Sequence, residues 1–177
     1  MRNILIVLFI SVILAILGNN NANKNKFTKI SKPTSTKNIT ISGLDGLGFS
    51  FKNIPNAVDN YLKNYSEIKD YYNADKKIVI YFRSEWPGLK LPEKELEEAV
   101  RPYMTSNEYT ESYNFYNFPI KKSREKREIM EAQIQFINAC NIFCIINPKT
   151  KQLFSADSIT IRQIVKIGSI IKQLKDW

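Results

Sequence analysis

The sequence predicts an α/β domain, and two neighbouring patterns support that prediction. A continuous run of β-branched and aromatic residues from Ile78 to Phe82 is typical of a strand buried on both faces of a mostly parallel sheet. Shortly after it, Pro92 suits a first helical turn, and apolar residues such as Leu96 and Val100 recur at helical spacing. Strand, short loop and helix form half of a βαβ unit, so we expect this strand to be central.

An apolar segment lies near the start of the chain. Residues 4–18 contain one polar side chain, Ser11, and follow Arg2. This length is at the upper edge of the about 7–15 residues of a signal-peptide core and below the about 17–25 residues of a membrane-spanning helix. We therefore expect residues 1–22 to direct export, either as a cleaved signal peptide or as an uncleaved anchor in the inner membrane. The protein is then periplasmic or secreted.

Residues 23–38 are predicted to form a flexible basic tether, because they are rich in Asn, Lys, Thr and Ser and lack apolar periodicity. Much of the formal net charge of +9 lies in and around this segment, which contains no acid. The rest of the chain is close to neutral, and this argues against nucleic-acid binding, which needs excess charge on a folded face. The tether is either a solvated linker or a segment in contact with an anionic membrane.

The next segments are assigned in chain order. Residues 39–51 are interpreted as a hairpin whose turn is Asp45-Gly46. Residues 55–75 carry an apolar stripe at helical spacing and predict one helix. Residues 109–120 place aromatic side chains alternately on two sides and predict a strand.

The C-terminal third predicts a helix, two strands and a last helix. Residues 123–137 form the first helix, with Ser123 at its N-cap. Residues 141–148 and 152–156 predict two strands that pair as a hairpin. The last helix begins after Asp157 or Ser158, and we expect Gly168 within it to allow close packing on the sheet.

Three short matches show a resemblance to the thioredoxin family. Glu85-Trp86 after IVIYFRS is similar to the acidic-Trp pair before the family's Cys-Gly-Pro-Cys motif, and Gly88 and Lys90 match the glycine and the following lysine of that loop. The stretch NIFCIINPKTKQLF resembles the family's β-hairpin. Over residues 39–177 the chain thus resembles a thioredoxin-like three-layer fold, which implies a central mixed sheet with helices on both faces.

The chain departs from the thioredoxin pattern at its redox positions. Pro87 and Leu89 stand where the family has its two cysteines, Tyr81 replaces the buried acid, and the cis-proline aligns near Asn141. Disulfide exchange needs a thiolate, which proline and leucine do not supply. The resemblance therefore implies a degenerate member without thiol chemistry at this loop, and we expect no cofactor.

The two cysteines, Cys140 and Cys144, are candidate thiols elsewhere in the chain. If both lie in one strand, their Cα atoms are about 13 Å apart at about 3.3 Å per residue, whereas a disulfide needs about 4.4–6.8 Å. We therefore expect two unbridged, buried cysteines, with Cys140 the more exposed because it precedes the strand. Two cysteines without any histidine do not predict a zinc site or a catalytic Ser-His or Cys-His pair.

These features favour binding of another protein, in envelope assembly, secretion or chaperoning, over catalysis. In the family the corresponding surface meets extended polypeptide, and we expect Trp86 and Leu89 to be exposed apolar anchors there. Alternatively, Trp86 closes the core over the helix start. The candidate binding residues are Arg83, Ser84, Glu85, Trp86, Pro87 and Leu89.

A basic cluster near residue 123 is a second candidate contact. Positive charge at a helix start opposes the helix dipole, which suggests a contact for an acidic partner, and the alternative is a solvated helix start. Two other functions stay open: a thiol-disulfide oxidoreductase that uses Cys140, and a secreted host-directed factor. The basic residues are Lys121, Lys122, Arg124, Lys126 and Arg127.

Overall fold

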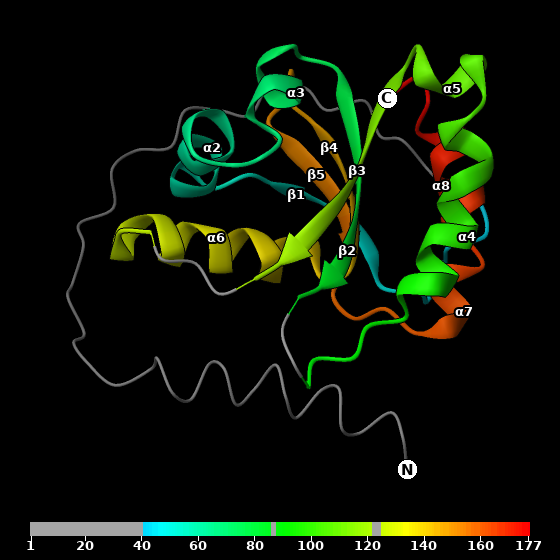
Figure 1. The fold of residues 1–177 in the computed structure, drawn as a ribbon. Coiled ribbons are helices and arrows are strands. Elements are labelled where there is room, and N and C mark those ends of the chain that lie inside the picture. The colour runs from blue at the N-terminus through cyan, green and yellow to red at the C-terminus, as the bar shows by residue number, and fades with distance from the viewer. Residues whose placement is uncertain (1–40, 86–87, 122–124) are drawn as a thin grey trace. The chain divides into compact units, whose positions relative to one another are not determined.

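The computed structural model describes residues 41–85, 88–121 and 125–177 (Figure 1), which belong to one unit, Ile39–Trp177. The predicted export segment and tether, residues 1–38, lie outside the described residues, as do Trp86, Pro87, Lys122 and Arg124. Among the helices that the structure describes, none combines the length and apolarity needed to cross a bilayer.

Helices and strands are interspersed along the described chain, as in an α/β fold. The strands are β1 (Phe49–Asn53), β2 (Lys77–Ser84), β3 (Tyr113–Ile120), β4 (Phe143–Asn147) and β5 (Gln152–Ala156). The helices are α2 (Asn56–Asn64), α3 (Lys69–Asn73), α4 (Glu93–Met104), α5 (Asn107–Thr110), α6 (Arg127–Cys140), α7 (Ile161–Ile164) and α8 (Ile167–Gln173).

The five strands form one mixed sheet in the order β1-β5-β4-β2-β3. β2 and β3 run parallel, while β2 with β4, β4 with β5, and β5 with β1 are antiparallel. β2 is flanked on both sides, and its residues from Ile78 to Phe82 are buried. The predictions of an α/β domain, a mixed sheet and a central strand at β2 are therefore confirmed.

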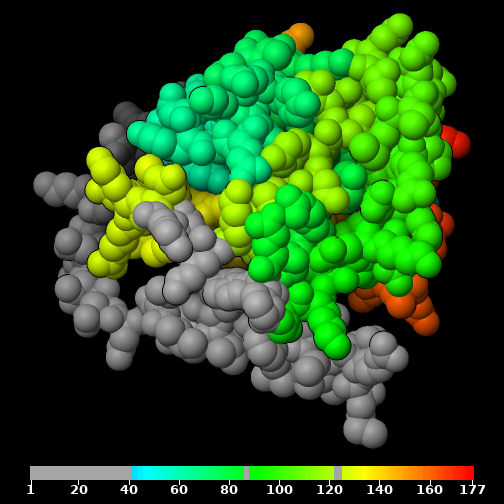
Figure 2. Space-filling model, in the orientation of Figure 1, coloured from blue at the N-terminus to red at the C-terminus, as the bar shows by residue number. Residues whose placement is uncertain are grey.

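Helices cover both faces of the sheet (Figure 1). On one face, Ile78, Ile80 and Phe82 join a core cluster with residues of α2 and α6. On the other, Val79 and Tyr81 join a second cluster with residues of α4, α7 and α8. On the side shown in Figure 2, the cyan-to-green residues of α2 lie against the yellow residues of α6.

The hairpin predicted for residues 39–51 is wrong over the residues described. Residues 41–48 form turns, and β1 pairs with β5, with Phe49 opposite Ala156. Gly46 has φ +73, as the predicted turn required, but two further glycines in this short stretch also have positive φ. Such a backbone follows a series of turns and not a straight strand.

Several boundaries also differ from the sequence prediction. The helix expected over 55–75 is broken between α2 and α3, and the strand expected from 109 begins at Tyr113, after the short helix α5. The last helix is capped by Thr160, whose N–H donates to Gln163 Oε1, and is divided into α7 and α8. At Gly168, the atoms nearest to the position of an added Cβ all belong to Tyr103 of α4.

Candidate functional site

The predicted binding loop and the predicted basic cluster begin side by side. β2 and β3 are in parallel register up to Ser84, which lies opposite Ile120. One residue further on, the Glu85 N–H donates to the Ile120 carbonyl at 3.0 Å. We call the end of the sheet at which β2 and β3 stop the carboxyl end. In open α/β sheets, ligands bind in this region.

The start of the loop after β2 is held by polar contacts. Arg83 Nη1 and Glu85 Oε1 are 2.6 Å apart, and the Ser84 N–H donates to Glu93 Oε1 at 2.7 Å. The second contact joins the end of β2 to the first turn of α4. Ser84 itself is half-buried, and Glu85 is exposed.

Further along the loop, Leu89 and Leu91 turn inward. Gly88 has φ +92, a conformation that favours glycine. Leu89 is half-buried and packs, together with Leu91, against the core cluster of α2 and α6. The prediction that Leu89 is an exposed anchor is therefore wrong, because this side chain completes the core.

The basic cluster is partly neutralised in the described residues. Arg127 Nε lies 2.7 Å from Glu131 Oε1, one helical turn further on, and Lys126 is exposed at the start of α6. Lys121 forms an ion pair with Glu67, which lies between α2 and α3. Lys126 thus presents positive charge to solvent at the start of α6.

Glu67 is a site residue that the sequence did not predict. Its two oxygens accept hydrogen bonds from Tyr116 Oη and Lys121 Nζ. Burial raises the pKa of Glu67, but the bonds from Lys121 and Tyr116 outweigh it and leave this pKa below its usual value. Burial and the bond to Glu67 raise the pKa of Tyr116 to about 12. These contacts tie the connection between α2 and α3 to β3.

A third segment reaches the carboxyl end between α6 and β4. The Phe82 N–H donates to the Ile142 carbonyl at 3.1 Å, so this turn lies next to the last part of β2. Asn141 has φ +58 and ψ −124, and its Nδ2 donates to the Asp157 carbonyl at 2.8 Å. None of the peptide bonds that the structure describes is cis, including the one at Asn141.

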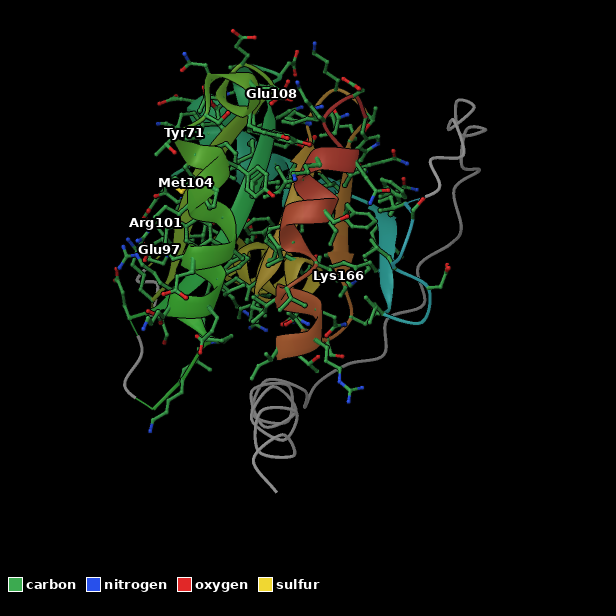
Figure 3. All side chains as sticks on the ribbon, turned by 90° about the vertical axis from the view of Figure 1, so that its right-hand side faces the viewer. Tyr71, Glu97, Arg101, Met104, Glu108 and Lys166 are labelled. Carbon is green, nitrogen blue, oxygen red and sulfur yellow. The ribbon has the colours of Figure 1, made fainter. Side chains whose placement is uncertain are left out.

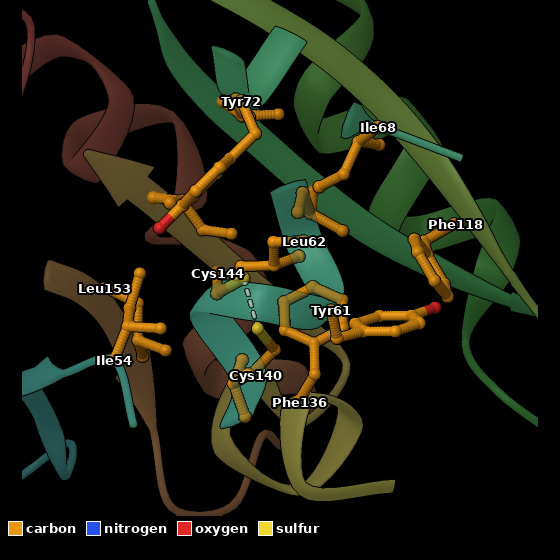
Figure 4. Packing of buried hydrophobic residues seen from close by; sticks show 14 of the residues in the cluster. Ile54, Tyr61, Leu62, Ile68, Tyr72, Phe118, Phe136, Cys140, Cys144 and Leu153 are labelled. Atoms are coloured by element: carbon orange, nitrogen blue, oxygen red, sulfur yellow. Dashed lines mark hydrogen bonds between the residues drawn. The ribbon is translucent and has the colours of Figure 1, made fainter. Parts of the chain in front are cut away.

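The positions of the two cysteines differ from the sequence prediction. Cys140 is the last residue of α6 and Cys144 lies in β4, so strand spacing does not separate them. Their Sγ atoms are 2.7 Å apart (Figure 4), so the expectation that one strand holds both cysteines and keeps them too far apart to meet is wrong. Both residues are fully buried, so the prediction that Cys140 is the more exposed is also wrong. Burial, followed by the neighbouring thiol, raises the pKa of Cys140 well above its usual value.

The acidic residues of α4 do not form a paired-carboxylate site. Glu97 pairs with Arg101 at 2.8 Å (Figure 3), and Glu98 lies 3.9 Å from Lys94. Glu93 points back to the Ser84 N–H, as described above. Glu93, Glu97 and Glu98 thus each have a different partner.

No cluster of three or more metal-binding side chains occurs in the part of the chain that the structure describes. Among the described residues, the carboxyl end presents the start of a loop and two ion pairs, Arg83 with Glu85 and Lys121 with Glu67. No protein-family model, curated protein or solved structure matches this chain.

Proposed function

We propose that this chain is an exported, thioredoxin-like module that binds another protein at the carboxyl end of its sheet. The succession β2-α4-β3-α6-β4-β5-α8 and the strand order β5-β4-β2-β3 support a thioredoxin-like arrangement, to which β1 adds an edge strand. Helices on both faces of the sheet fit the same arrangement.

Binding is favoured over thiol chemistry by the composition of the loop. The sequence has no cysteine between Arg83 and Pro92. The sulfur of Cys140 is buried, and its raised pKa disfavours the thiolate, which is the reactive form. Both properties weigh against an oxidoreductase that uses this residue.

The observation that carries the proposal is the hydrogen bond from the Glu85 N–H to the Ile120 carbonyl. It brings the start of the loop, at Glu85, next to the end of β3, after which the basic segment begins with Lys121. An aromatic anchor beside positive charge suits a partner segment with an apolar residue and nearby acids. We propose an exposed polypeptide of this kind in the envelope or the secreted space as the partner.

The test is in-cell crosslinking of the full chain, followed by capture from the membrane and soluble fractions. We expect the wild type to capture a defined set of partners and Trp86→Ala not to capture them. Tyr71→Ala is the matched control, because it removes an aromatic side chain that is 40% exposed on α3, which leads to the opposite end of β2. Circular dichroism establishes that each variant folds.

A second variant tests the charge of the surface. Lys126→Glu reverses an exposed charge at the start of α6, and we expect this variant to capture less of the partner than the wild type does. We also expect added salt to weaken capture by the wild type. Unchanged capture by folded Trp86→Ala and Lys126→Glu contradicts binding at the carboxyl end. Recovery of the protein only from the culture medium, without envelope partners, supports a host-directed factor instead.

A further inference from the structure

The geometry points to a disulfide bond between Cys140 and Cys144, which ties the end of α6 to the buried strand β4. The inference concerns a covalent modification inside the domain and does not depend on the identity of a partner. It rests on the separation of the two sulfurs, on the contacts that hold their backbone, and on their apolar surroundings.

The separation of the sulfur atoms is too short for two unbonded thiols at rest. Cys140 Sγ and Cys144 Sγ are 2.7 Å apart. A disulfide bond is about 2.03–2.05 Å long, whereas non-bonded carbon atoms, which are smaller than sulfur, pack at about 3.5–4.0 Å. The observed distance lies between these ranges. The two sulfurs therefore need to move only slightly closer to form a bond, and they need to move further than that apart to remain as two separate thiols.

Polar contacts on both sides of the pair hold the backbone in place. The Asn141 N–H donates to the Ile137 carbonyl at 2.8 Å, which closes the last turn of α6. Ser155 Oγ donates to the Ala139 carbonyl at 2.6 Å, and Ser155 lies opposite Cys144 in the sheet. The end of α6 is therefore fixed to β5 at the level of Cys144. The short distance between the two sulfurs thus lies in a part of the backbone that hydrogen bonds hold in place.

The surroundings of the pair suit a structural bond and not a catalytic thiol. Cys140 and Cys144 belong to the core cluster with Leu62, Phe136 and Leu153, and all five are fully buried (Figure 4). A thiolate there has lost its hydration, which raises the pKa of Cys140. A disulfide carries no charge and no N–H or O–H donor, so it is compatible with this core.

The bond forms by exchange with a small-molecule or protein disulfide, for which oxidised glutathione is the probe. One cysteine, as the thiolate, attacks a glutathione sulfur and releases one glutathione thiolate, which takes up the proton lost. The second cysteine, also deprotonated, attacks the mixed disulfide and releases the other glutathione. Two protein thiols and one glutathione disulfide thus give one protein disulfide and two glutathione thiols. Because both sulfurs are buried in the native fold, we expect the exchange to occur during folding or local opening.

The first test measures the bond directly in the full chain. The protein is unfolded with reductant, refolded in mixtures of reduced and oxidised glutathione, then denatured and alkylated. We expect refolded wild type to take up no alkylating agent and to yield one peptide pair linked through Cys140 and Cys144. Single variants Cys140→Ser and Cys144→Ser serve as controls, and each is expected to take up one alkyl group or one glutathione. Refolded wild type with two alkylated cysteines at every glutathione ratio overturns the inference.

The second test asks whether the bond stabilises the fold. It uses the wild-type protein, so its result does not depend on the folding of a variant. Wild-type protein is unfolded in urea before and after dithiothreitol treatment, and reduction is expected to lower the urea midpoint. Where the double variant Cys140→Ala with Cys144→Ala folds, its midpoint is expected not to respond to dithiothreitol. Equal midpoints for the oxidised and reduced wild type contradict a stabilising role, even if the linked peptide is found.

Discussion

Tyr103 of α4 covers Gly168 of α8 so closely that a side chain at position 168 fits only if Tyr103 shifts: a Cβ atom there would lie 2.4 Å from Tyr103 Oη and 3.2 Å from its Cζ. We predict that Gly168→Ala lowers the free energy of unfolding by about 1 kcal/mol. Overpacking costs about 1–3 kcal/mol, and alanine returns up to about 1 kcal/mol through its helix propensity. Urea unfolding of the wild type and the variant measures the difference.

The same pair offers its own control. Tyr103→Phe removes the oxygen atom that comes nearest and keeps the ring, which stacks edge-on against Tyr109 at 4.9 Å. In this background we expect Gly168→Ala to be nearly neutral. A loss of the same size in both backgrounds contradicts an effect through Tyr103.

Asp59 of α2 gives the protein a pH-dependent stability. Tyr72 Oη donates to Asp59 Oδ1 at 2.6 Å, and Lys151 and Lys63 form ion pairs with the same carboxylate. Burial raises the pKa of Asp59, but these hydrogen bonds outweigh it and leave the pKa below its usual value. A carboxyl group with a lowered pKa stabilises the fold above its unfolded pKa of about 3.9, and this contribution is lost as the pH falls through the folded value.

We therefore predict that Asp59→Asn destabilises the protein at neutral pH by about 1 kcal/mol and has little effect in acid below the folded pKa. Urea unfolding at a series of pH values measures both limits. The exposed Asp70→Asn in the neighbouring helix α3 is the control, and we expect it to change the curve little. An Asp59→Asn deficit that is constant with pH contradicts a role for the carboxylate charge.

The bond from the Ser84 N–H to Glu93 Oε1 predicts a local effect at the carboxyl end. Glu93→Ala removes a charged acceptor, so we expect a loss of about 1–2 kcal/mol and faster hydrogen exchange at the Ser84 amide. Glu95→Ala is the matched control, because it also removes a negative charge from the first turn of α4. If both variants exchange the Ser84 amide at the same rate, the bond to Glu93 does not protect it.

Asn141 combines a positive φ with a side-chain hydrogen bond, and two substitutions separate these contributions. Asn141→Gly accepts φ +58 without strain but loses the bond to the Asp157 carbonyl, while Asn141→Ala loses the bond and keeps the strain. We predict that the alanine variant is the less stable by about 1 kcal/mol, as measured by thermal unfolding. Equal stability of the two variants contradicts a cost of backbone strain.

The elements that sequence analysis predicted well are those whose residues carry their own pattern. The apolar run of β2 and the spaced apolar residues of α4 reflect local periodicity, which burial in the sheet and its cover then reinforces. The hairpin at Asp45-Gly46 was wrong for a tertiary reason. The partner of β1 in the sheet is β5, so the residues before β1 do not have to supply a strand that pairs with it.

The details of the site depended on boundaries and on distant partners. α6 continues to Cys140, and this helix end, followed by the turn at Asn141, brings together two sulfurs that strand spacing separates. Glu67 was missed because its partners Tyr116 and Lys121 are far away in the sequence, and no local pattern marks such a contact. A boundary error of a few residues therefore changed the chemistry assigned to the cysteines.

The pairing of β1 with β5 also determines when the sheet can be completed. Phe49 and Ala156 lie near opposite ends of the described chain, and β5 is the neighbour of β1 in the described sheet. During synthesis from the N-terminus, β1 emerges early but has to wait for β5, after β2, β3 and β4 have been made. Contacts between such distant segments form slowly, because a long loop has to close first. We therefore expect the seam between β1 and β5 to close late in folding, and until then β1 needs protection from pairing with other chains.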